Sequence, residues 1–335
     1  NLTTGSEQTF NFSGSISGAD DTKDFWLGYE KFQTDGESAM TDNEETDSYH
    51  SDTFVGNFGY KLNDKIKFNA NSRFIYSFLN YDSLDSSFST NTNDNSQNWN
   101  KEWNTSLGMT HNPSNKFSQQ IKLVHSYNDR TYDAYSEWGS GKSEAEYLGF
   151  RDAIYYNGNY KFNLDNSIVF GYEREDDQIG YNKDLTGMSN KAFYTSSGYF
   201  DFQSRLSKNI YTTFGSRFDE NSIAENEDSH RVTLAYLFDD KLTKLKSSFG
   251  TGFRFPSLYE LYYVYAANSK SLGSVKAENS KSFDFGIEKN FPDFGLNFEA
   301  NFFNIEYEDV LEGWEDGTSS GLAVSYTHLT LPTKA

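Results

Sequence analysis

Strict alternation of apolar and polar residues recurs along this chain over unusually long runs. Between residues 65 and 78, Phe and Tyr occupy only even positions, whereas Lys, Asn and Arg occupy only odd ones. Successive side chains of a β-strand point to opposite faces, so this period predicts a strand whose two faces have different surroundings. The same period recurs in residues 116–128, 210–218, 231–238, 283–288 and 294–302. No helical period competes in these windows, and we predict an all-β chain.

The connections between these runs alternate in length. Short turns are expected at residues 18–21, 62–64, 112–115, 163–166, 206–209, 238–241 and 291–293. Long polar segments lie between them, at residues 33–50, 80–98, 129–148, 175–191, 219–229 and 255–279. The pattern predicts about 14 strands, with short turns at one end and long loops at the other, which is typical of outer-membrane β-barrels. A soluble β-sandwich has no reason to sort its loops in this way.

Composition narrows the class further. The 335 residues include 30 Phe, 24 Tyr and 5 Trp, which is far too aromatic for a disordered chain. Mean hydropathy is -0.77, and no apolar run approaches the roughly 18 residues of a membrane helix. We predict an antiparallel transmembrane β-barrel, incomplete, with its apolar face toward lipid and unpaired edges at Gln8–Ser17 and Leu296–Val310. The alternative is a soluble all-β protein with these faces packed together.

Charge and rare residues exclude several functions. The net charge of -20 disfavours nucleic acid, which needs clustered Lys and Arg. The absence of cysteine excludes a disulfide framework, a thiolate zinc site and a cysteine nucleophile. The five histidines are scattered, and no zinc-protease, serine-hydrolase or phosphate-loop motif is present. We therefore predict that the protein is not an enzyme. A protease-type barrel with acidic and histidine residues converging from distant loops is the alternative, and no positive feature supports it.

A motif carries a resemblance to a known family. Residues 247–290 read SSFGTGFRFPSLYELYYVYAANSKSLGSVKAENSKSFDFGIEKN, which resembles the barrel of TonB-dependent outer-membrane receptors. The matching positions are Gly252, Phe253, Pro256, Ser257, Leu258, Glu260, Leu261, Tyr262, Glu278, Ser280 and Gly286. Ala277 stands where the family usually has a proline, which removes one rigid turn element. Residues 304–313 and 49–68 are similar to segments of cobalamin receptors in particular.

The resemblance implies a 22-stranded barrel with an N-terminal plug domain, located in the outer membrane of a Gram-negative bacterium. It also implies active uptake of a bulky nutrient, with energy supplied by the inner-membrane TonB complex through the plug. Plug, TonB box and final strands are not recognised in this sequence, so residues 1–323 are expected to form about 14 of the 22 strands. Cobalamin or a related corrinoid is the expected ligand, and a ferric siderophore is the alternative. A passive porin or an adhesin barrel represents a different functional class.

Residues 324–335 need separate treatment. The segment VSYTHLTLPT, residues 324–333, resembles translated sequencing-adapter DNA of the kind that ends open reading frames in metagenome assemblies. A genuine further strand is the alternative, because residues 326–330 do alternate. We expect a non-native tail.

Two groups of residues are candidate binding sites. Six carboxylates fall between residues 35 and 47 without a Lys or Arg among them, and hard cations such as calcium prefer such oxygen ligands. In cobalamin receptors, which this segment resembles, the corresponding loop binds calcium. Asp42, Glu45 and Asp47 are the expected ligands, and an ordinary solvated loop is the alternative. Tyr259, Tyr262, Tyr263 and Tyr265 are candidate contacts for a corrinoid or siderophore, because tyrosine combines flat contact area with a hydroxyl. They could equally be interfacial or packing residues.

Overall fold

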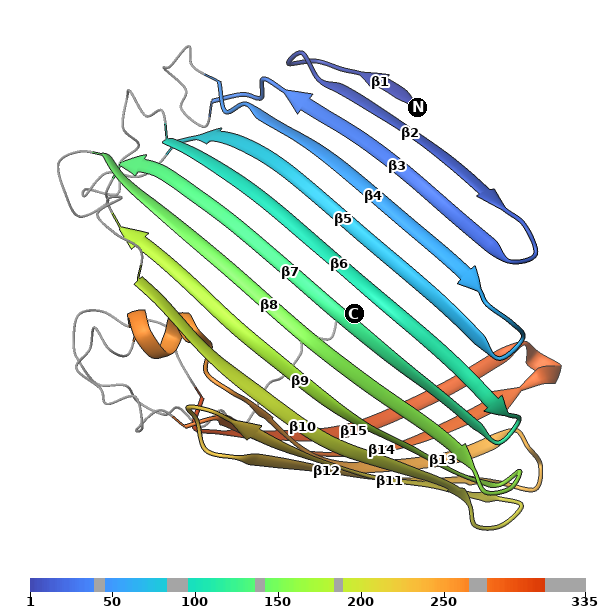
Figure 1. Cartoon of the computed structure of the whole chain (residues 1–335). Coiled ribbons are helices and arrows are strands. Elements are labelled where there is room, and N and C mark those ends of the chain that lie inside the picture. Colours follow the sequence, from blue (N-terminus) through green and yellow to red (C-terminus); the bar gives the residue numbers. More distant parts are fainter. Residues whose placement is uncertain (39–45, 83–95, 136–141, 184–188, 265–275, 311–335) are drawn as a thin grey trace. The chain divides into compact units, whose positions relative to one another are not determined.

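The chain folds as a meander of strands in which each strand pairs with its neighbours in sequence (Figure 1). The computed structural model describes residues 1–38, 46–82, 96–135, 142–183, 189–264 and 276–310. Within these ranges, 15 antiparallel strands form one sheet in the order β1 to β15. The predicted all-β antiparallel class is confirmed, with one strand more than the 14 expected.

The strands vary in length between 3 and 20 residues. They are β1 (Leu2–Thr4), β2 (Phe10–Ala19), β3 (Lys23–Thr34), β4 (Tyr49–Lys61), β5 (Ile66–Tyr81), β6 (Ser96–Ser114), β7 (Phe117–Tyr135), β8 (Lys142–Lys161), β9 (Asn166–Lys183), β10 (Ser189–Arg205), β11 (Ile210–Asn221), β12 (Glu227–Leu237), β13 (Thr243–Arg254), β14 (Glu278–Phe291) and β15 (Leu296–Glu308). In the described ranges, two short helical turns, η1 (Glu260–Val264) and η3 (Pro292–Phe294), interrupt the pattern. No helix in the described ranges is long and apolar enough to cross a membrane.

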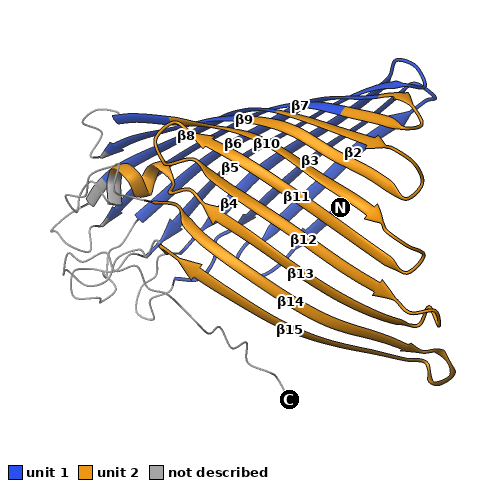
Figure 2. Cartoon of the chain, turned by 90° about the horizontal axis from the view of Figure 1, so that it is seen from below, with its two compact units in different colours: residues 1–111, 120–154, 175–192 blue, residues 112–119, 155–174, 193–335 orange. Residues whose placement is uncertain are grey.

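Two compact units divide the chain, and Figure 2 colours them separately. Unit 1 consists of residues 1–111, 120–154 and 175–192, and unit 2 of residues 112–119, 155–174 and 193–335. In unit 1, the register places Tyr29, Phe54, Phe74 and Trp103 in one row across β3 to β6. Phe54 and Trp103 remain 51% and 46% exposed. We call this surface the apolar face and the opposite surface the polar face.

Unit 2 repeats the arrangement. The register places Phe214, Val232, Phe249 and Phe283 in one row across β11 to β14, and all four are exposed. In the described part of the whole chain, the buried apolar side chains are only Ala153, Pro256, Leu258, Leu261 and Ala277. A soluble two-layer protein would bury these aromatic rows against each other, because apolar burial is its main source of stability. The soluble alternative is therefore wrong.

The seven short turns are confirmed to within about two residues, and the largest displacement is between β6 and β7, where the turn lies at residues 115–116 and not at 112–115. Several are closed by a side chain of the turn itself. Asp20 Oδ1 accepts hydrogen bonds from the amides of Thr22 and Lys23 at 2.7 and 2.8 Å. Asn63 and Asp240 accept two amides each in the same manner, which is the local bonding that makes Asn and Asp favourable in turns.

Three predicted loops prove much shorter than expected, and one of them, residues 219–229, is reduced to residues 222–226 between β11 and β12. Residues 129–148 were expected as a loop, but β7 continues to Tyr135 and β8 begins at Lys142. Residues 175–191 were also expected as a loop, but β9 continues to Lys183 and β10 begins at Ser189. Paired aromatic and charged side chains support these extensions. Tyr147 and Tyr181 stack with ring centroids 4.9 Å apart, and Arg151 Nε donates to Asp177 at 2.6 Å. Such pairs stabilise adjacent strands without apolar alternation, which is why the sequence pattern failed here.

The predicted edge at Gln8–Ser17 is wrong for its first part only, since residues 14–17 pair with β3 and with no second strand among the described residues. Leu2–Thr4 forms β1 and pairs with Phe10–Phe12, so β2 has partners on both sides over those residues. The three-residue β1 was too short for periodicity to detect. At the other end, β15 pairs with β14 from Leu296 to Glu308, and no other pairing of β15 occurs in the described residues. The expected tail, residues 324–335, lies outside the described residues.

Candidate functional site

The motif segment surrounds one arginine at the loop end of β13 and β14. Arg254 ends β13, and the register pairs it with Glu278, the first residue of β14. Its guanidinium donates to Glu278 Oε2 and Oε1 at 2.8 and 3.0 Å. It also donates to Glu260 Oε2 and Oε1 at 3.1 and 3.0 Å. Two bidentate pairs of this kind fix the orientation of both carboxylates. We call Arg254, Ser257, Glu260 and Glu278 the Arg254 clasp.

The clasp continues into the first turn of the helical segment. The Ser257 amide donates to Glu260 Oε2 at 2.7 Å, and the Glu260 amide donates to Ser257 Oγ at 3.2 Å. This reciprocal pair is a capping box, which satisfies amides that a helix start would otherwise leave unpaired. The Leu261 amide donates to the Ser257 carbonyl at 2.9 Å. Glu260 therefore binds the cap of η1 and the end of β13 with one carboxylate.

A small apolar core supports the same segment. Pro256, Leu258, Leu261 and Ala277 are all buried. Apart from this core, Ala153 is the other buried apolar residue in the described chain. Ala277, which replaces the usual proline, is 1% exposed, so the side chain still packs although the rigid element is lost. The connection is held by burial as well as by charge.

Opposing effects set the charge state of Glu260. Burial raises the pKa of this carboxyl, but the hydrogen bonds from Arg254 and from the Ser257 amide and hydroxyl outweigh it and lower the pKa below its ordinary 4.5. The folded state therefore favours the ionised form. A lowered pKa contributes stability that is fully present above the unfolded value and is lost as pH falls through the folded value.

We therefore expect the Ser257 amide to be protected from hydrogen exchange at pH 7 and at pH 5. As pH falls below about 4.5, protection relative to the intrinsic rate should decrease about five- to tenfold, since a charge-assisted bond becomes a neutral one. Exchange measured by NMR or mass spectrometry on the full-length protein would show this. Glu260→Gln should remove the pH dependence, and an unchanged pH profile in that variant would contradict the assignment.

The structure places the predicted tyrosines unevenly. Tyr259 is 44% exposed beside the clasp, and Tyr262 is half-buried on η1. The backbone of Tyr263 belongs to η1, while Tyr265 lies outside the described residues. Figure 2 shows this helical segment at the end of the strands opposite the short turns. Tyr259 is thus the candidate contact that the structure shows at a surface.

Each of the motif glycines leaves room for a neighbour. Gly252 pairs with Ser280, whose hydroxyl donates to the Gly252 carbonyl at 3.3 Å. At Gly286, a Cβ would collide with Asn301 and with Lys246. Lys246 on β13 crosses β14 at this point and forms ion pairs of 2.6 Å with Glu288 and with Glu299 on β15. Because Gly286 has no side chain, Lys246 can reach across β14 to Glu299 on β15.

A polar-face network in unit 2 was missed by sequence reasoning. Tyr199 on β10 lies over Gly171 on β9 and donates to the Asn157 side chain on β8. Its ring also lies 5.6 Å from the guanidinium of Arg217, which pairs with Glu173 at 2.7 Å and with Asp219 at 3.0 Å. These residues come from four strands. Only the register brings them together, so no local sequence signal could have identified them. Arg254 was missed for the same reason.

The predicted calcium ligands are only partly described. Asp42 and Glu45 lie outside the described residues, whereas Asp47 is half-buried just before β4. Gly36, which has a φ of +65°, packs against the Asp47 carbonyl so closely that a Cβ there would collide with it. This contact brings the two ends of the acidic segment together. Among the residues that the structure describes, no group of three His, Asp or Glu is arranged to hold a metal.

Comparisons with known proteins decide the family. The family model described as the TonB dependent receptor-like β-barrel matches residues 3–327. The chain belongs to this family. It is a family of the outer membrane of Gram-negative bacteria, so the apolar face of this receptor chain meets lipid. No curated protein matches the chain in sequence.

Several solved structures share the fold at low sequence identity. The ferripyoverdine receptor of the outer membrane of Pseudomonas aeruginosa has 12% identity and a TM-score of 0.72, over 93% of this chain and 48% of that one. The copper transporter OprC has 12% identity and a TM-score of 0.72, over 92% and 52%. The RagAB peptide importer has 12% identity and a TM-score of 0.64, over 90% and 44%. The chain therefore spans about half the length of the structures it matches.

Proposed function

We propose that this chain is the barrel part of a receptor that takes up a bulky nutrient across the outer membrane, with energy from the inner-membrane TonB complex. The observation that carries the proposal is the family match over residues 3–327. The Arg254 clasp supports it, because it holds a tyrosine-bearing segment at the loop end of the strands. Loops on a rigid barrel are where binding residues are usually placed.

The ligand class is proposed from two sources. The resemblance to cobalamin receptors supports a corrinoid, and Tyr259 with Tyr262 offers flat contact area for such a ligand. The similar structures include receptors or importers for ferripyoverdine, copper and peptide by their names, none of which is a corrinoid. A ferric siderophore is therefore the second candidate.

Uptake by the full-length receptor tests the proposal. A Gram-negative strain that lacks its own receptors should accumulate radiolabelled cobalamin or a ferric siderophore when it produces this protein. Accumulation above the concentration outside should disappear when the inner-membrane TonB complex is deleted. Uptake that persists without TonB would instead identify a passive porin, and attachment to surfaces without any uptake would identify an adhesin.

The acidic segment provides a second prediction. If calcium orders this segment, replacing Asp42 and Asp47 with Asn and Glu45 with Gln should weaken ligand binding in the presence of calcium and make binding insensitive to the metal. Stability should change by less than about 0.5 kcal/mol, because exposed loop substitutions have small effects. Calcium titration of ligand affinity in both full-length proteins provides the measurement. Equal affinities with and without calcium in the wild type would leave the solvated-loop interpretation.

A further inference from the structure

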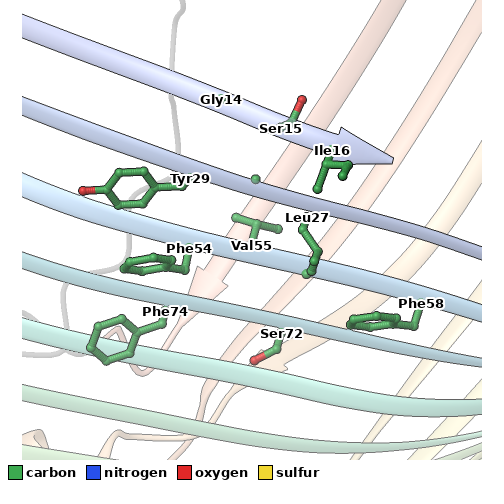
Figure 3. Close-up of a pocket in the computed structure, with 12 residues that line it drawn as sticks. Gly14, Ser15, Ile16, Leu27, Tyr29, Phe54, Val55, Phe58, Ser72 and Phe74 are labelled. Atoms are coloured by element: carbon green, nitrogen blue, oxygen red, sulfur yellow. The ribbon is translucent and has the colours of Figure 1, made fainter. Parts of the chain in front are cut away.

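The apolar face of unit 1 contains a hollow that uptake does not explain. It has a volume of about 660 Å³ and lies across β2 to β5. Figure 3 shows Tyr29, Phe54 and Phe74 along one side of it and Leu27 and Phe58 along the other, with Ser72 between. The hollow is therefore a groove with large apolar side chains on both sides.

The strand register explains why the groove exists. One row across the strands contains Ile16, Leu27, Gly56, Ser72 and Thr105, so it changes from large to small side chains at β4. The rows on either side carry large side chains at β4, namely Phe54 and Phe58. Gly56 has no side chain to fill the space, so it forms the floor of the groove. The rings of Phe54 and Phe58, on either side of it, are 51% and 52% exposed.

The polar atoms in the floor are bonded among themselves. Ser72 Oγ lies 2.9 Å from Thr105 Oγ1, and it accepts a hydrogen bond from Trp103 Nε1 at 3.0 Å. Buried or lipid-facing hydroxyls without partners would favour a polar occupant, because an unsatisfied polar group is costly in an apolar medium. Here that demand is met within the protein. The groove therefore presents an apolar surface.

The groove lies midway along the apolar part of β4. Gly56 is four residues from Tyr60, near the short turn, and four residues from Asp52, where polar residues begin on this face. Asp52 accepts a hydrogen bond of 2.5 Å from the Tyr29 hydroxyl and so marks the polar boundary. The eight residue steps between these limits span about 26 Å along the strand, or about 20 Å of height for a strand tilted by about 40°, so they fit within the apolar band of an outer-membrane barrel, about 25 Å tall.

Membrane hydrocarbon covers this face in the outer membrane. We propose that the groove between Phe54, Phe74 and Leu27, Phe58 binds one acyl chain of a membrane lipid in preference to the rest of the apolar face. The preference does not come from the hydrophobic effect, since lipid tails are as apolar as the groove. The preference comes from dispersion contacts. An acyl chain in the groove contacts the floor and the large side chains on both sides, and these contacts are lost when the groove is empty.

Photo-cross-linking of the full-length receptor tests this site. The protein is reconstituted in phosphatidylcholine vesicles that contain phosphatidylcholine with a diazirine near the middle of one acyl chain. Labelling of β3–β5 peptides should exceed labelling of the equally apolar row Phe214, Val232 and Phe249 by about three- to tenfold, as expected for packing energies inside membranes. Equal labelling of both regions would overturn the proposal.

Gly56→Leu should fill the groove and reduce the labelling of β3–β5 to the level of the reference row. Its Cβ would contact only the flexible ends of Leu27 and Phe58, at 3.3 and 3.5 Å, so the barrel should still fold. Gly198→Leu is the matched control, since Gly198 pairs with Phe218 on the apolar face of unit 2 and a Cβ there meets nothing within 4 Å. The control should keep the labelling ratio of the wild type. Cross-links between two receptor copies through β2–β5, with no lipid label there, would identify a subunit interface and refute the lipid site.

Discussion

Arg254→Met is expected to release η1 and to abolish most ligand uptake while leaving the sheet folded. The substitution removes four hydrogen bonds and leaves the carboxylates of Glu260 and Glu278, which are 23% and 19% exposed, without a cation between them. Breaking a buried ion pair costs about 3 to 5 kcal/mol. The Arg254 side chain is 47% exposed, so solvent screening reduces the expected local cost to about 1 to 3 kcal/mol. Hydrogen exchange at residues 257–264 and uptake of labelled ligand provide the two measurements.

Lys246→Met is the matched control. Lys246 also bridges two carboxylates on the polar face, but it does so near the turn end of the same strands. This variant should exchange normally at residues 257–264 and should retain uptake. Arg254→Lys should be intermediate, because it keeps the charge and loses both bidentate pairs. Wild-type exchange in Arg254→Met would show that the small apolar core around Leu258 and Leu261 holds the segment alone.

Gly171→Ala is expected to destabilise unit 2 by about 1 to 3 kcal/mol, the usual cost of overpacking. A Cβ at this position would collide with the Tyr199 ring and lie 2.6 Å from the Tyr156 carbonyl oxygen, which is backbone and cannot move freely. It would also displace Tyr199 from Asn157. The free energy of unfolding of the full-length protein, from urea titration in detergent micelles, gives the comparison.

Two further variants separate the causes. Gly198→Ala should be neutral within about 0.5 kcal/mol, because its Cβ would enter open space. Combining Gly171→Ala with Tyr199→Ala should recover some of the stability that is lost through the collision with the Tyr199 ring. It should recover none of the stability that is lost through the collision with the Tyr156 carbonyl. Equal stabilities of Gly171→Ala and Gly198→Ala would show that the close approach of Tyr199 has no structural importance.

The sequence predicted those features that depend on neighbouring residues. Alternation identified most strands, and the short turns were found because Asp20, Asn63 and Asp240 bond to amides two and three residues ahead. The family motif was found because it is contiguous. The ends of β7 to β10 were predicted wrongly, since cross-strand pairs such as Tyr147 with Tyr181 stabilise them without alternation.

The candidate site was predicted only in part. Glu260 and Glu278 were identified as motif residues, but the arginine that joins them was not, although it stands inside the same segment. Its role depends on the register of β13 with β14, which pairs residues 24 positions apart. The network around Arg217 depends in the same way on several registers at once. Long-range register is the information that a single sequence does not reveal to pattern analysis.

The sequential pairing of the strands has a consequence for how such sheets can change during evolution. Because each strand pairs with its chain neighbours and the short turns are closed by their own side chains, a hairpin is a nearly independent module. Duplication or loss of one hairpin would leave the pairing partners elsewhere along the chain unaltered. Sheets of this kind can therefore gain or lose strands in steps of two by simple gene duplication or deletion, which fits the even strand numbers common among bacterial outer-membrane barrels.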